Sequence, residues 1–183
     1  MNDNKNKTNN KNEAVEWIKS ILLAIVIAVL IKTFLFITTY VLGNSMYPTL
    51  HERDRLFANK IPLYFSGPDR GDIIILKAPD DPDKDYIKRV IGIGGDTVAI
   101  IEGKVYVNGE LLQEPYVKEG SYTHVYGENY WEVPEGYVFV LGDNRLEGAS
   151  KDSRYFGCVP LKSVKGIVNF RYFPFNDRFG KVE

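Results

Sequence analysis

Residues 97–112 read TVAIIEGKVYVNGELL, and they decide the fold class of most of the chain. β-Branched and aromatic residues dominate this stretch, as is typical of strands. Asn108 and Gly109 stand between two alternating apolar runs, which indicates a two-residue hairpin turn because both residue types tolerate a positive φ. The stretch therefore predicts antiparallel strands joined by tight turns.

Similar runs recur on both sides of this hairpin. They are separated by Gly, Asp, Asn and Pro and read RLFANKI, RGDIIIL, DYIKRVIGI, GYVFVLG and VKGIVNFRYF. Short apolar runs with turn formers between them are typical of all-β domains. We therefore predict a mostly β, antiparallel domain over residues 38–183, in which RGD at 70–72 and GIGGD at 92–96 are turns. An adhesion motif is the alternative for the first, and the second lacks the spacing of a phosphate-binding loop.

The first part of the chain has a different pattern. Residues 18–37 are mostly apolar and can form a helix about 30 Å long, which matches the hydrocarbon core of a bilayer. Trp17 lies where an interfacial anchor belongs. Residues 1–17 form an Asn- and Lys-rich tail, which we predict to be disordered up to residue 12. The sequence thus predicts one transmembrane anchor ahead of the β domain.

Charges on the two sides of this anchor differ. Lysines occur at positions 5, 7, 11 and 19, whereas residues 38–52 contain no Lys or Arg. The positive-inside bias therefore predicts a single-pass, type II protein of the cell membrane, with a cytoplasmic N-terminus and an extracellular β domain. A cleaved signal peptide ending near Gly43 is the alternative, which Lys32 and the apolar length disfavour.

Composition narrows the chemistry. The net charge of the 183 residues is −1, which argues against a nucleic-acid partner. Cys158 is the only cysteine, so an intrachain disulfide is excluded, and one cysteine with two histidines does not make a zinc site. We therefore expect no metal and no organic cofactor.

Ser45 lies in GNSMYPTL, a turn-forming segment at residues 43–50, directly after the apolar region. It is a candidate nucleophile if a base can reach it. His51 and His124 are candidate bases, but neither stands in a distinctive context.

Lys88 has a more informative setting. It lies in the apolar run YIKRVIGI beside Arg89, and because side chains alternate in a strand, one of the two must face the apolar side or an edge. A buried lysine loses hydration, which lowers its pKa. The neutral amine that results can act as general base for a serine hydroxyl, as in known Ser-Lys pairs. A lysine at a surface edge is the alternative interpretation.

Several motifs together resemble the signature boxes of type I signal peptidases. They occur in the family's order and read GNSMYPTL, RGDIII, YIKRVIGIGGD, GDNR and SKDSRYFG. One N-terminal span followed by a small outer domain is similar to the enzymes of Gram-positive bacteria. The resemblance covers nearly the whole chain from the span to FRYFPF. Each motif alone is weak, whereas the ordered set is specific.

The resemblance implies a membrane-bound serine endopeptidase that removes signal peptides from secretory preproteins after small-x-small sites. It implies that Ser45 is the nucleophile and Lys88 the general base, and that Asp152 and Arg154 form a supporting ion pair. The supporting residues that it implies are Met46, Pro48, Gly142, Asp143, Asn144, Ser150, Asp152 and Arg154.

Two positions depart from the family pattern. Ser150 falls where the family has a hydroxyl that orients the lysine, but the segment LEGASK is longer than usual, which leaves Ser153 as an alternative. Gly43 stands where some relatives have a hydroxyl that binds the oxyanion. A backbone N–H, that of Ser45, is then expected to serve as the donor.

Other functions fit parts of the sequence. The main alternative is a non-catalytic, membrane-anchored β module that binds exported proteins. A self-cleaving repressor would begin with a helix-turn-helix, and a sortase-like transpeptidase would need a histidine and an arginine around Cys158. Aromatic residues in FRYFPF, together with Trp131, are candidates for contact with the lipid bilayer, although a place in the strand core is the more ordinary interpretation.

Overall fold

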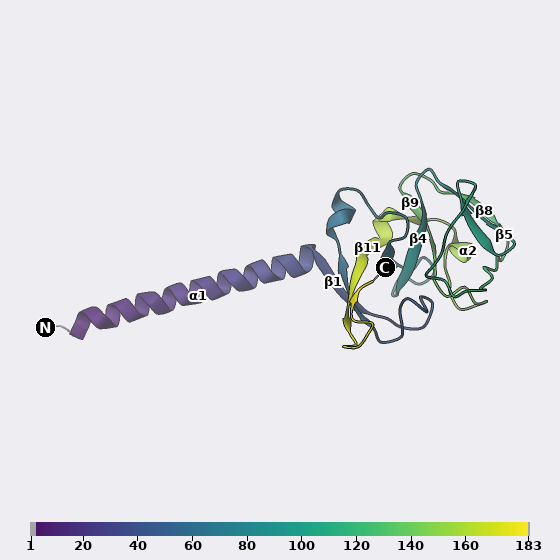
Figure 1. Cartoon of the computed structure of the whole chain (residues 1–183). Coiled ribbons are helices and arrows are strands. Elements are labelled where there is room, and N and C mark those ends of the chain that lie inside the picture. Colours follow the sequence, from purple (N-terminus) through teal and green to yellow (C-terminus); the bar gives the residue numbers. More distant parts are fainter. Residues whose placement is uncertain (1–2, 183) are drawn as a thin grey trace. The chain divides into compact units, whose positions relative to one another are not determined.

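The computed structural model describes residues 3–182 and divides the chain into two units (Figure 1). The first unit extends to Leu35, and the second begins at Phe36. The first is helical, and the second contains all the strands found in the described residues.

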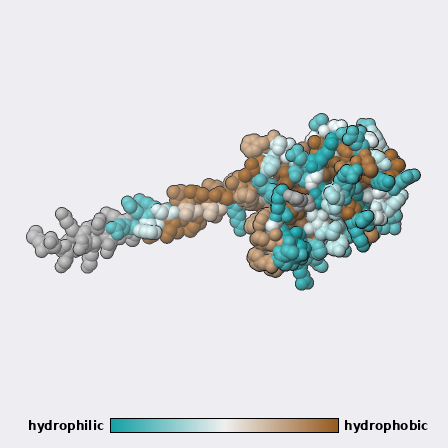
Figure 2. Space-filling view, in the orientation of Figure 1, coloured by the Kyte–Doolittle hydropathy of each residue, from teal (hydrophilic) through white to brown (hydrophobic). Residues whose placement is uncertain are grey.

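Helix α1 (Asp3–Phe34) forms the first unit. Its segment Val15–Phe34 is long and apolar enough to cross a membrane, by length and composition. The side chains of this segment are exposed to solvent and form the hydrophobic helix surface in Figure 2. An exposed apolar surface of this length is stable when lipid covers it.

Two boundaries of the helix differ from the predictions. The helix ends at Phe34, so the predicted anchor at residues 18–37 is too long at its C-terminal end, and Phe36–Tyr40 form strand β1 instead. Pairing of β1 with its neighbour strand outweighs the apolar continuity that suggested helix. At the other end the helix includes residues 3–12, where we predicted disorder, because a nucleated helix extends at low cost. Met1 and Asn2 lie outside the described residues.

The second unit consists of two antiparallel sheets, which confirms the predicted fold class. The large sheet has the order β1-β2-β11-β3-β4-β9-β10, with β12 paired to β11, and the small sheet has the order β7-β6-β5-β8. The large sheet comprises β1 (Phe36–Tyr40), β2 (Arg55–Asn59), β3 (Ile73–Lys77), β4 (Asp85–Ile93), β9 (Tyr137–Leu141), β10 (Val159–Pro160), β11 (Val164–Phe173) and β12 (Gly180–Lys181). The small sheet comprises β5 (Thr97–Ile101), β6 (Lys104–Val107), β7 (Glu110–Leu111) and β8 (Tyr130–Glu132). Three short helices connect strands, namely α2 (Ser153–Phe156) and the 3-10 helices Ile61–Tyr64 and Leu161–Ser163.

The predicted hairpin is present between β6 and β7. Val107 pairs with Glu110, and the two residues between them, Asn108 and Gly109, have φ values of 53° and 81°. Both therefore adopt the left-handed conformation that this turn requires. Strands β4 and β11 coincide with the predicted runs DYIKRVIGI and VKGIVNFRYF, and RGD lies in the turn before β3. Of GIGGD, only Gly94 and Gly95 form a turn, because β4 continues through Gly92 and Ile93.

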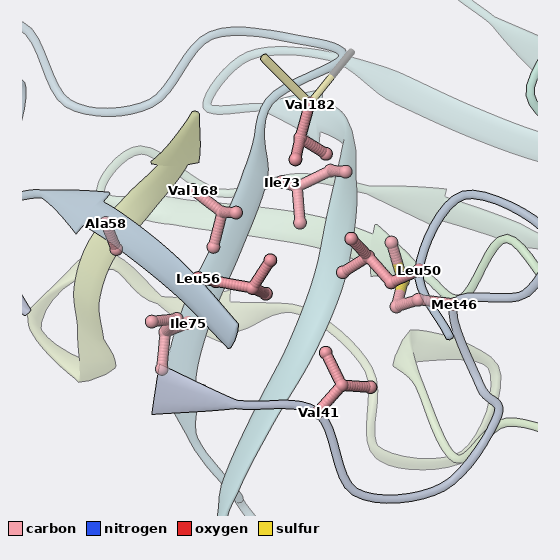
Figure 3. Packing of buried hydrophobic residues seen from close by; sticks show 9 residues of the cluster. All are labelled: Val41, Met46, Leu50, Leu56, Ala58, Ile73, Ile75, Val168 and Val182. Atoms are coloured by element: carbon pink, nitrogen blue, oxygen red, sulfur yellow. The ribbon is translucent and has the colours of Figure 1, made fainter. Parts of the chain in front are cut away.

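Strand β4 is buried on both faces, because its side chains reach all three hydrophobic clusters of the β domain. Ile87 packs against the first cluster, Ile91 belongs to the second and Val90 to the third. The first cluster joins β2, β3 and β11 to the segment before β2 (Figure 3). Its members are Val41, Met46, Leu50, Leu56, Ala58, Ile73, Ile75, Val168 and Val182.

Aromatic residues divide between core and surface. Trp131 belongs to the second cluster, where its ring centroid lies 4.8 Å from that of Phe139. It is therefore a core residue, which agrees with the ordinary interpretation and removes it as a lipid contact. Phe170, Phe173 and Phe175, from the FRYFPF segment, are exposed.

Candidate active site

Ser45 lies in a tight turn between β1 and β2. The Tyr47 N–H donates to the Asn44 carbonyl at 3.1 Å, and the Leu50 N–H donates to the Met46 carbonyl at 2.8 Å. Met46 and Leu50 are buried in the first hydrophobic cluster, whereas Ser45 itself is half-buried. Pro48 lies exposed in the same turn. The hydroxyl thus sits on a turn whose apolar side chains are fixed in the core.

Lys88 lies on β4 with its ammonium against this hydroxyl. Its Nζ donates to Ser45 Oγ at 2.8 Å and to the carbonyl oxygen of Ile87 at 3.0 Å. The side chain is 3% exposed, so the surface-edge interpretation is wrong. Burial lowers the pKa of Lys88 to about 8, although the negative charges of Asp152 and Asp143 oppose this shift. The predicted pair of Ser45 and Lys88 therefore meets in space, across 43 residues of sequence.

Asn144 and Gly142 fix the position of the turn at residues 44–50, which is called the nucleophile turn below because Ser45 is the candidate nucleophile. The Asn144 N–H donates to the Ser45 carbonyl at 3.0 Å, and its side-chain amide donates to the Asn44 carbonyl at 3.0 Å. A Cβ added at Gly142 would lie 2.5 Å from the Ser45 carbonyl oxygen and 2.3 Å from Ser150 Oγ. Because real Cβ atoms do not approach so closely, only glycine permits this contact.

Asp152 organises the segment behind Gly142. Its carboxylate accepts hydrogen bonds from the Gly142 N–H at 3.0 Å and from Ser150 Oγ at 2.8 Å. Arg154 donates to it through Nε and Nη2, each at 2.8 Å, and both residues are buried. The predicted ion pair is therefore present. It also caps helix α2, because the Arg154 N–H donates to the same carboxylate.

The two serine candidates occupy different positions. Ser150 is buried beside Gly142 and donates its hydroxyl to Asp152. Ser153 instead accepts a hydrogen bond from the Val140 N–H of β9 at 2.9 Å, which assigns it to the fold of the large sheet. Neither hydroxyl hydrogen-bonds to Lys88 in the described part of the chain. Ser150 is nonetheless the one next to the nucleophile turn.

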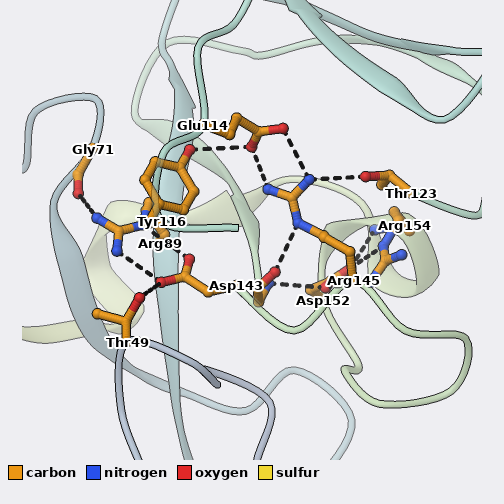
Figure 4. A network of polar contacts seen from close by, with 11 residues as sticks. Thr49, Gly71, Arg89, Glu114, Tyr116, Thr123, Asp143, Arg145, Asp152 and Arg154 are labelled. Atoms are coloured by element: carbon orange, nitrogen blue, oxygen red, sulfur yellow. Dashed lines mark hydrogen bonds and ion pairs between the residues drawn. The ribbon is translucent and has the colours of Figure 1, made fainter. Parts of the chain in front are cut away.

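Arg89 and Asp143 form a second buried ion pair (Figure 4). Arg89 donates to the two carboxylate oxygens at 2.9 and 2.7 Å, and Thr49 Oγ1 donates to the same carboxylate at 2.6 Å. Arg89 Nη1 also donates to the Gly71 carbonyl at 2.8 Å. This bidentate arrangement connects β4, the segment after β9 and the nucleophile turn.

Four further residues, which the sequence did not single out, extend this network. Arg145 is 1% exposed and donates to the Gly142 carbonyl at 2.9 Å and to Thr123 Oγ1 at 2.9 Å. It also pairs with Glu114, which accepts a hydrogen bond from Tyr116. The Tyr116 ring lies under the Arg89 guanidinium, 3.8 Å from its centroid. Arg145 ends the GDNR motif, which was the one available signal, whereas its partners lie far away in sequence.

The histidines have no such setting. The His51 ring packs against Tyr47 and the His124 ring against Tyr122, with centroids 5.1 and 4.8 Å apart. Neither hydrogen-bonds to Ser45 in the described residues. Within residues 3–182, no three His, Cys, Asp or Glu side chains are grouped so that they could hold a metal ion.

A groove of about 660 Å³ leads to the Ser45–Lys88 pair. One wall is the segment 39–46, the other is 83–88, and residues 148, 149 and 151 add to the lining. Strand β4 pairs with β3 from Asp85 to Arg89, but its pairing with β9 begins only at Arg89. One edge of residues 85–88 therefore faces the groove. An extended peptide could add to this edge as a strand.

Known proteins match the chain over most of its length. Residues 14–173 match the family described as signal peptidase, peptidase S26. A signal peptidase I of Bacillus amyloliquefaciens is 40% identical, with 97% of each chain covered. The signal peptidase I of Bacillus licheniformis is 42% identical, with 93% of this chain and 94% of the relative covered. The signal peptidase I S of Bacillus subtilis (strain 168) is 39% identical, with 91% and 93% covered.

A crystal structure of a signal peptidase I from Enterococcus faecalis V583 is 37% identical, covering 55% of this chain and 95% of that chain with a TM-score of 0.46. The family match at residues 14–173 spans every segment that builds the groove and the Ser45–Lys88 pair. The chain therefore belongs to the signal peptidase family, peptidase S26.

Proposed function

We propose that Ser45 and Lys88 are the catalytic nucleophile and general base of this signal peptidase. The chain is a serine endopeptidase that removes signal peptides. The observation that supports the assignment is the 2.8 Å contact between Lys88 Nζ and Ser45 Oγ, made by a lysine that is 3% exposed. A nucleophile and a base within hydrogen-bond reach, with the base held by a further group, are the requirement for covalent catalysis.

The environment of Lys88 prepares it to accept a proton. A lysine with a pKa of about 8 is partly neutral near physiological pH, unlike a solvated lysine with a pKa of ~10.4. The neutral amine takes the proton of Ser45 Oγ as the oxygen attacks the carbonyl carbon at the cleavage site. Lys88 then gives this proton to the departing amine, which leaves an ester between Ser45 and the signal peptide.

Hydrolysis of the ester repeats the same proton transfers. Lys88 takes a proton from a water molecule, the hydroxide oxygen attacks the ester carbonyl, and Ser45 Oγ regains the proton as it leaves. The oxyanion in both steps requires an N–H donor. Within residues 3–182 the backbone N–H of Ser45 makes no hydrogen bond, so we assign this role to it. Gly43 has no side chain, so this position cannot supply a hydroxyl as a second donor.

The supporting residues hold this geometry. Asn144 and Gly142 set the backbone of Ser45, while Asp143 and Asp152 are occupied by Arg89 and Arg154. We assign the orientation of Lys88 to the segment that contains Ser150, because Ser150 borders Gly142 whereas Ser153 hydrogen-bonds to Val140 of β9. The substrate would pair as an extended strand with residues 85–88. The small side chains of its first and third residues before the cut would lie against the groove wall.

We further propose that Val15–Phe34 anchors the enzyme in the cell membrane, as a single-pass type II protein with residues from Phe36 onward outside the cell. Apolar length and the lysines at positions 5, 7 and 11, ahead of the apolar segment, support this orientation. Ser45 follows Phe34 by 11 residues, which span at most roughly 40 Å. The nucleophile would then meet secretory preproteins close to the place where their own apolar segments leave the bilayer.

The dyad is tested with the full chain and a preprotein with a small-x-small site. Ser45→Ala and Lys88→Met should each reduce cleavage by about 10³-fold or more, since members of such a unit fail together. Wild-type kcat/KM should rise with pH through about 8, because only the unprotonated amine of Lys88 is competent.

The His51→Ala, His124→Ala double variant is the matched control and should keep nearly full activity. Retained cleavage in Ser45→Ala would overturn the assignment of Ser45 as the nucleophile. Full activity in Lys88→Met would remove the lysine from the mechanism.

A further inference from the structure

A second pocket lies away from the groove of the active site. It has a volume of about 500 Å³ and is lined by Thr38, Thr39, Tyr40, Arg53, Arg55, Tyr172 and Phe173. These residues come from β1, from the turn before β2, from β2 and from the end of β11. We propose that this pocket binds the phosphate of an anionic phospholipid headgroup. The proposal rests on the membrane anchoring proposed above.

The face around the pocket is not that of an ordinary water-exposed sheet. The register places Tyr40 opposite Arg55 and Thr38 opposite Phe57, and β11 sets Phe173 opposite Arg55. These residues share the outward face of the sheet, where polar side chains are usual. Here the exposed residues include Phe36, Tyr40, Phe57, Phe170, Phe173, Phe175 and Phe179. A contiguous exposed apolar surface of this kind marks a contact with another apolar phase.

Charge distinguishes the pocket from a purely apolar surface. Arg53 and Arg55 are both exposed, and neither forms an ion pair within residues 3–182. Asp54, which lies between them in sequence, is fully buried and is occupied by Arg171 and Arg178. The pocket therefore presents two cations without an acidic neighbour in its lining. Guanidinium groups match the geometry of phosphate oxygens and donate to them in pairs.

The fold holds the side chain of Arg55 and the backbone of Arg53. The Arg55 guanidinium lies over the Phe173 ring, 5.2 Å from its centroid. Arg53 has a φ of 68°, a conformation that is uncommon for a residue with a side chain, and its N–H donates to the Val41 carbonyl at 2.9 Å. A residue such as glycine would fit this turn with less strain. The structure thus keeps an arginine where the backbone alone does not favour one.

The pocket follows the apolar helix closely in sequence. Thr38 follows Phe34 by four residues, which span at most roughly 14 Å. Aromatic residues combined with Arg are also the usual composition at the level of lipid headgroups. A phospholipid offers what this pocket lacks, namely a negative phosphate next to apolar chains. The bound headgroup would hold the β1 edge, and with it the nucleophile turn that follows β1, at the membrane surface.

The test uses the full chain reconstituted into vesicles of phosphatidylcholine, with or without phosphatidylglycerol. The KM for cleavage of a membrane-inserted preprotein should be about tenfold lower in the anionic vesicles than in phosphatidylcholine alone. The reason is that each basic residue near the membrane surface adds to the attraction between the enzyme and anionic lipid. Arg53→Gln with Arg55→Gln should abolish this difference. Lys104→Gln with Lys118→Gln is the control, since it removes the same charge from exposed positions near the small sheet and should leave the difference unchanged.

Several results separate the proposal from its alternatives. An equal loss in both double variants would show a diffuse charge effect and overturn the pocket, as would an unchanged lipid response in the arginine variant. Inhibition of the lipid response by inorganic phosphate, with direct phosphate binding in phosphatidylcholine vesicles, would assign the site to a free anion instead. Cleavage of a short soluble peptide should be equal in all three proteins and in both lipid mixtures, so that a failure of the catalytic dyad appears there independently.

Discussion

Two neighbouring residues of β4, Lys88 and Arg89, are equally buried but have opposite surroundings. Each is 3% exposed. Arg89 has a bidentate carboxylate partner in Asp143, while the hydrogen bonds of Lys88 within residues 3–182 go to a hydroxyl and a carbonyl. The carboxylates that oppose the lowering of the pKa of Lys88 are mainly those of Asp152 and Asp143, and arginines pair with both. The fold thus pairs Arg89 directly with a carboxylate and leaves Lys88, the proposed general base, without one in direct contact.

The largest effect on activity is expected when Lys88 is replaced by arginine, so that both positions of β4 carry a permanent cation. Lys88→Arg places a group that stays protonated at every accessible pH against Ser45. Cleavage should fall by about 10³-fold or more, because no base remains for the hydroxyl. Lys84→Arg is the control, since this exposed residue also lines the groove and pairs with Asp81. Preprotein cleavage measures both, and an Lys88→Arg enzyme within about tenfold of wild type would contradict the comparison.

The reverse change acts on Arg89 and removes the carboxylate of Asp143. Asp143→Asn takes the bidentate partner away from a buried guanidinium, which should lower the free energy of unfolding by about 3–5 kcal/mol. Asp85→Asn removes only the exposed pair with Lys165 and should cost about 1 kcal/mol or less. Urea unfolding of the full chain in detergent measures both values. Equal effects of the two substitutions would mean that burial of the Arg89 pair has no special importance.

The smallest effect concerns stability at Lys88. Its pKa is about 8 in the folded protein and ~10.4 when unfolded, so the unfolded chain binds more protons between these values. The folded state therefore carries a desolvation penalty that is complete below pH 8 and disappears as the pH rises toward 10.4. Lys88→Met should raise the free energy of unfolding at pH 7 by about 3 kcal/mol, and this gain should shrink at alkaline pH.

Lys104→Met, at an exposed position of β6, is the matched control for that measurement and should show no such pH dependence. If Lys88→Met is instead less stable than wild type at pH 7, the lysine is better compensated than its partners indicate. The variant would also separate stability from activity, since the same change that stabilises the fold abolishes the base.

Local patterns predicted much of this molecule. Strand β4, strand β11 and the Asn108-Gly109 hairpin follow from residues adjacent in sequence, where alternation and turn chemistry act directly. The apolar setting of Lys88 in its strand made it a candidate base, but its pairing with Ser45 was predicted from the resemblance to type I signal peptidases. Alternation predicted that one of Lys88 and Arg89 would face the apolar side or an edge. Both are buried, because β4 lies between clusters on its two faces.

Features that depend on distant partners could not be predicted. Strand β1 looked like the end of the apolar helix, since only its pairing with β2 distinguishes it. Arg145 is an ordinary charged residue in sequence, and its burial depends on Glu114 and Thr123 from another part of the chain. The difference between Ser150 and Ser153 likewise appears only when Gly142 and Val140 are placed beside them.

The open edge of β4 at residues 85–88, which the groove needs for binding an extended peptide, also creates a risk of aggregation. Unpaired strand edges next to apolar residues can join other chains and seed aggregation. Charges of both signs surround this edge, at Asp83, Lys84 and Asp85. They hinder the docking of a second copy of the sheet, while a single extended polypeptide can still enter. Replacing these charges to widen the range of accepted sequences would therefore be expected to reduce the solubility of the enzyme.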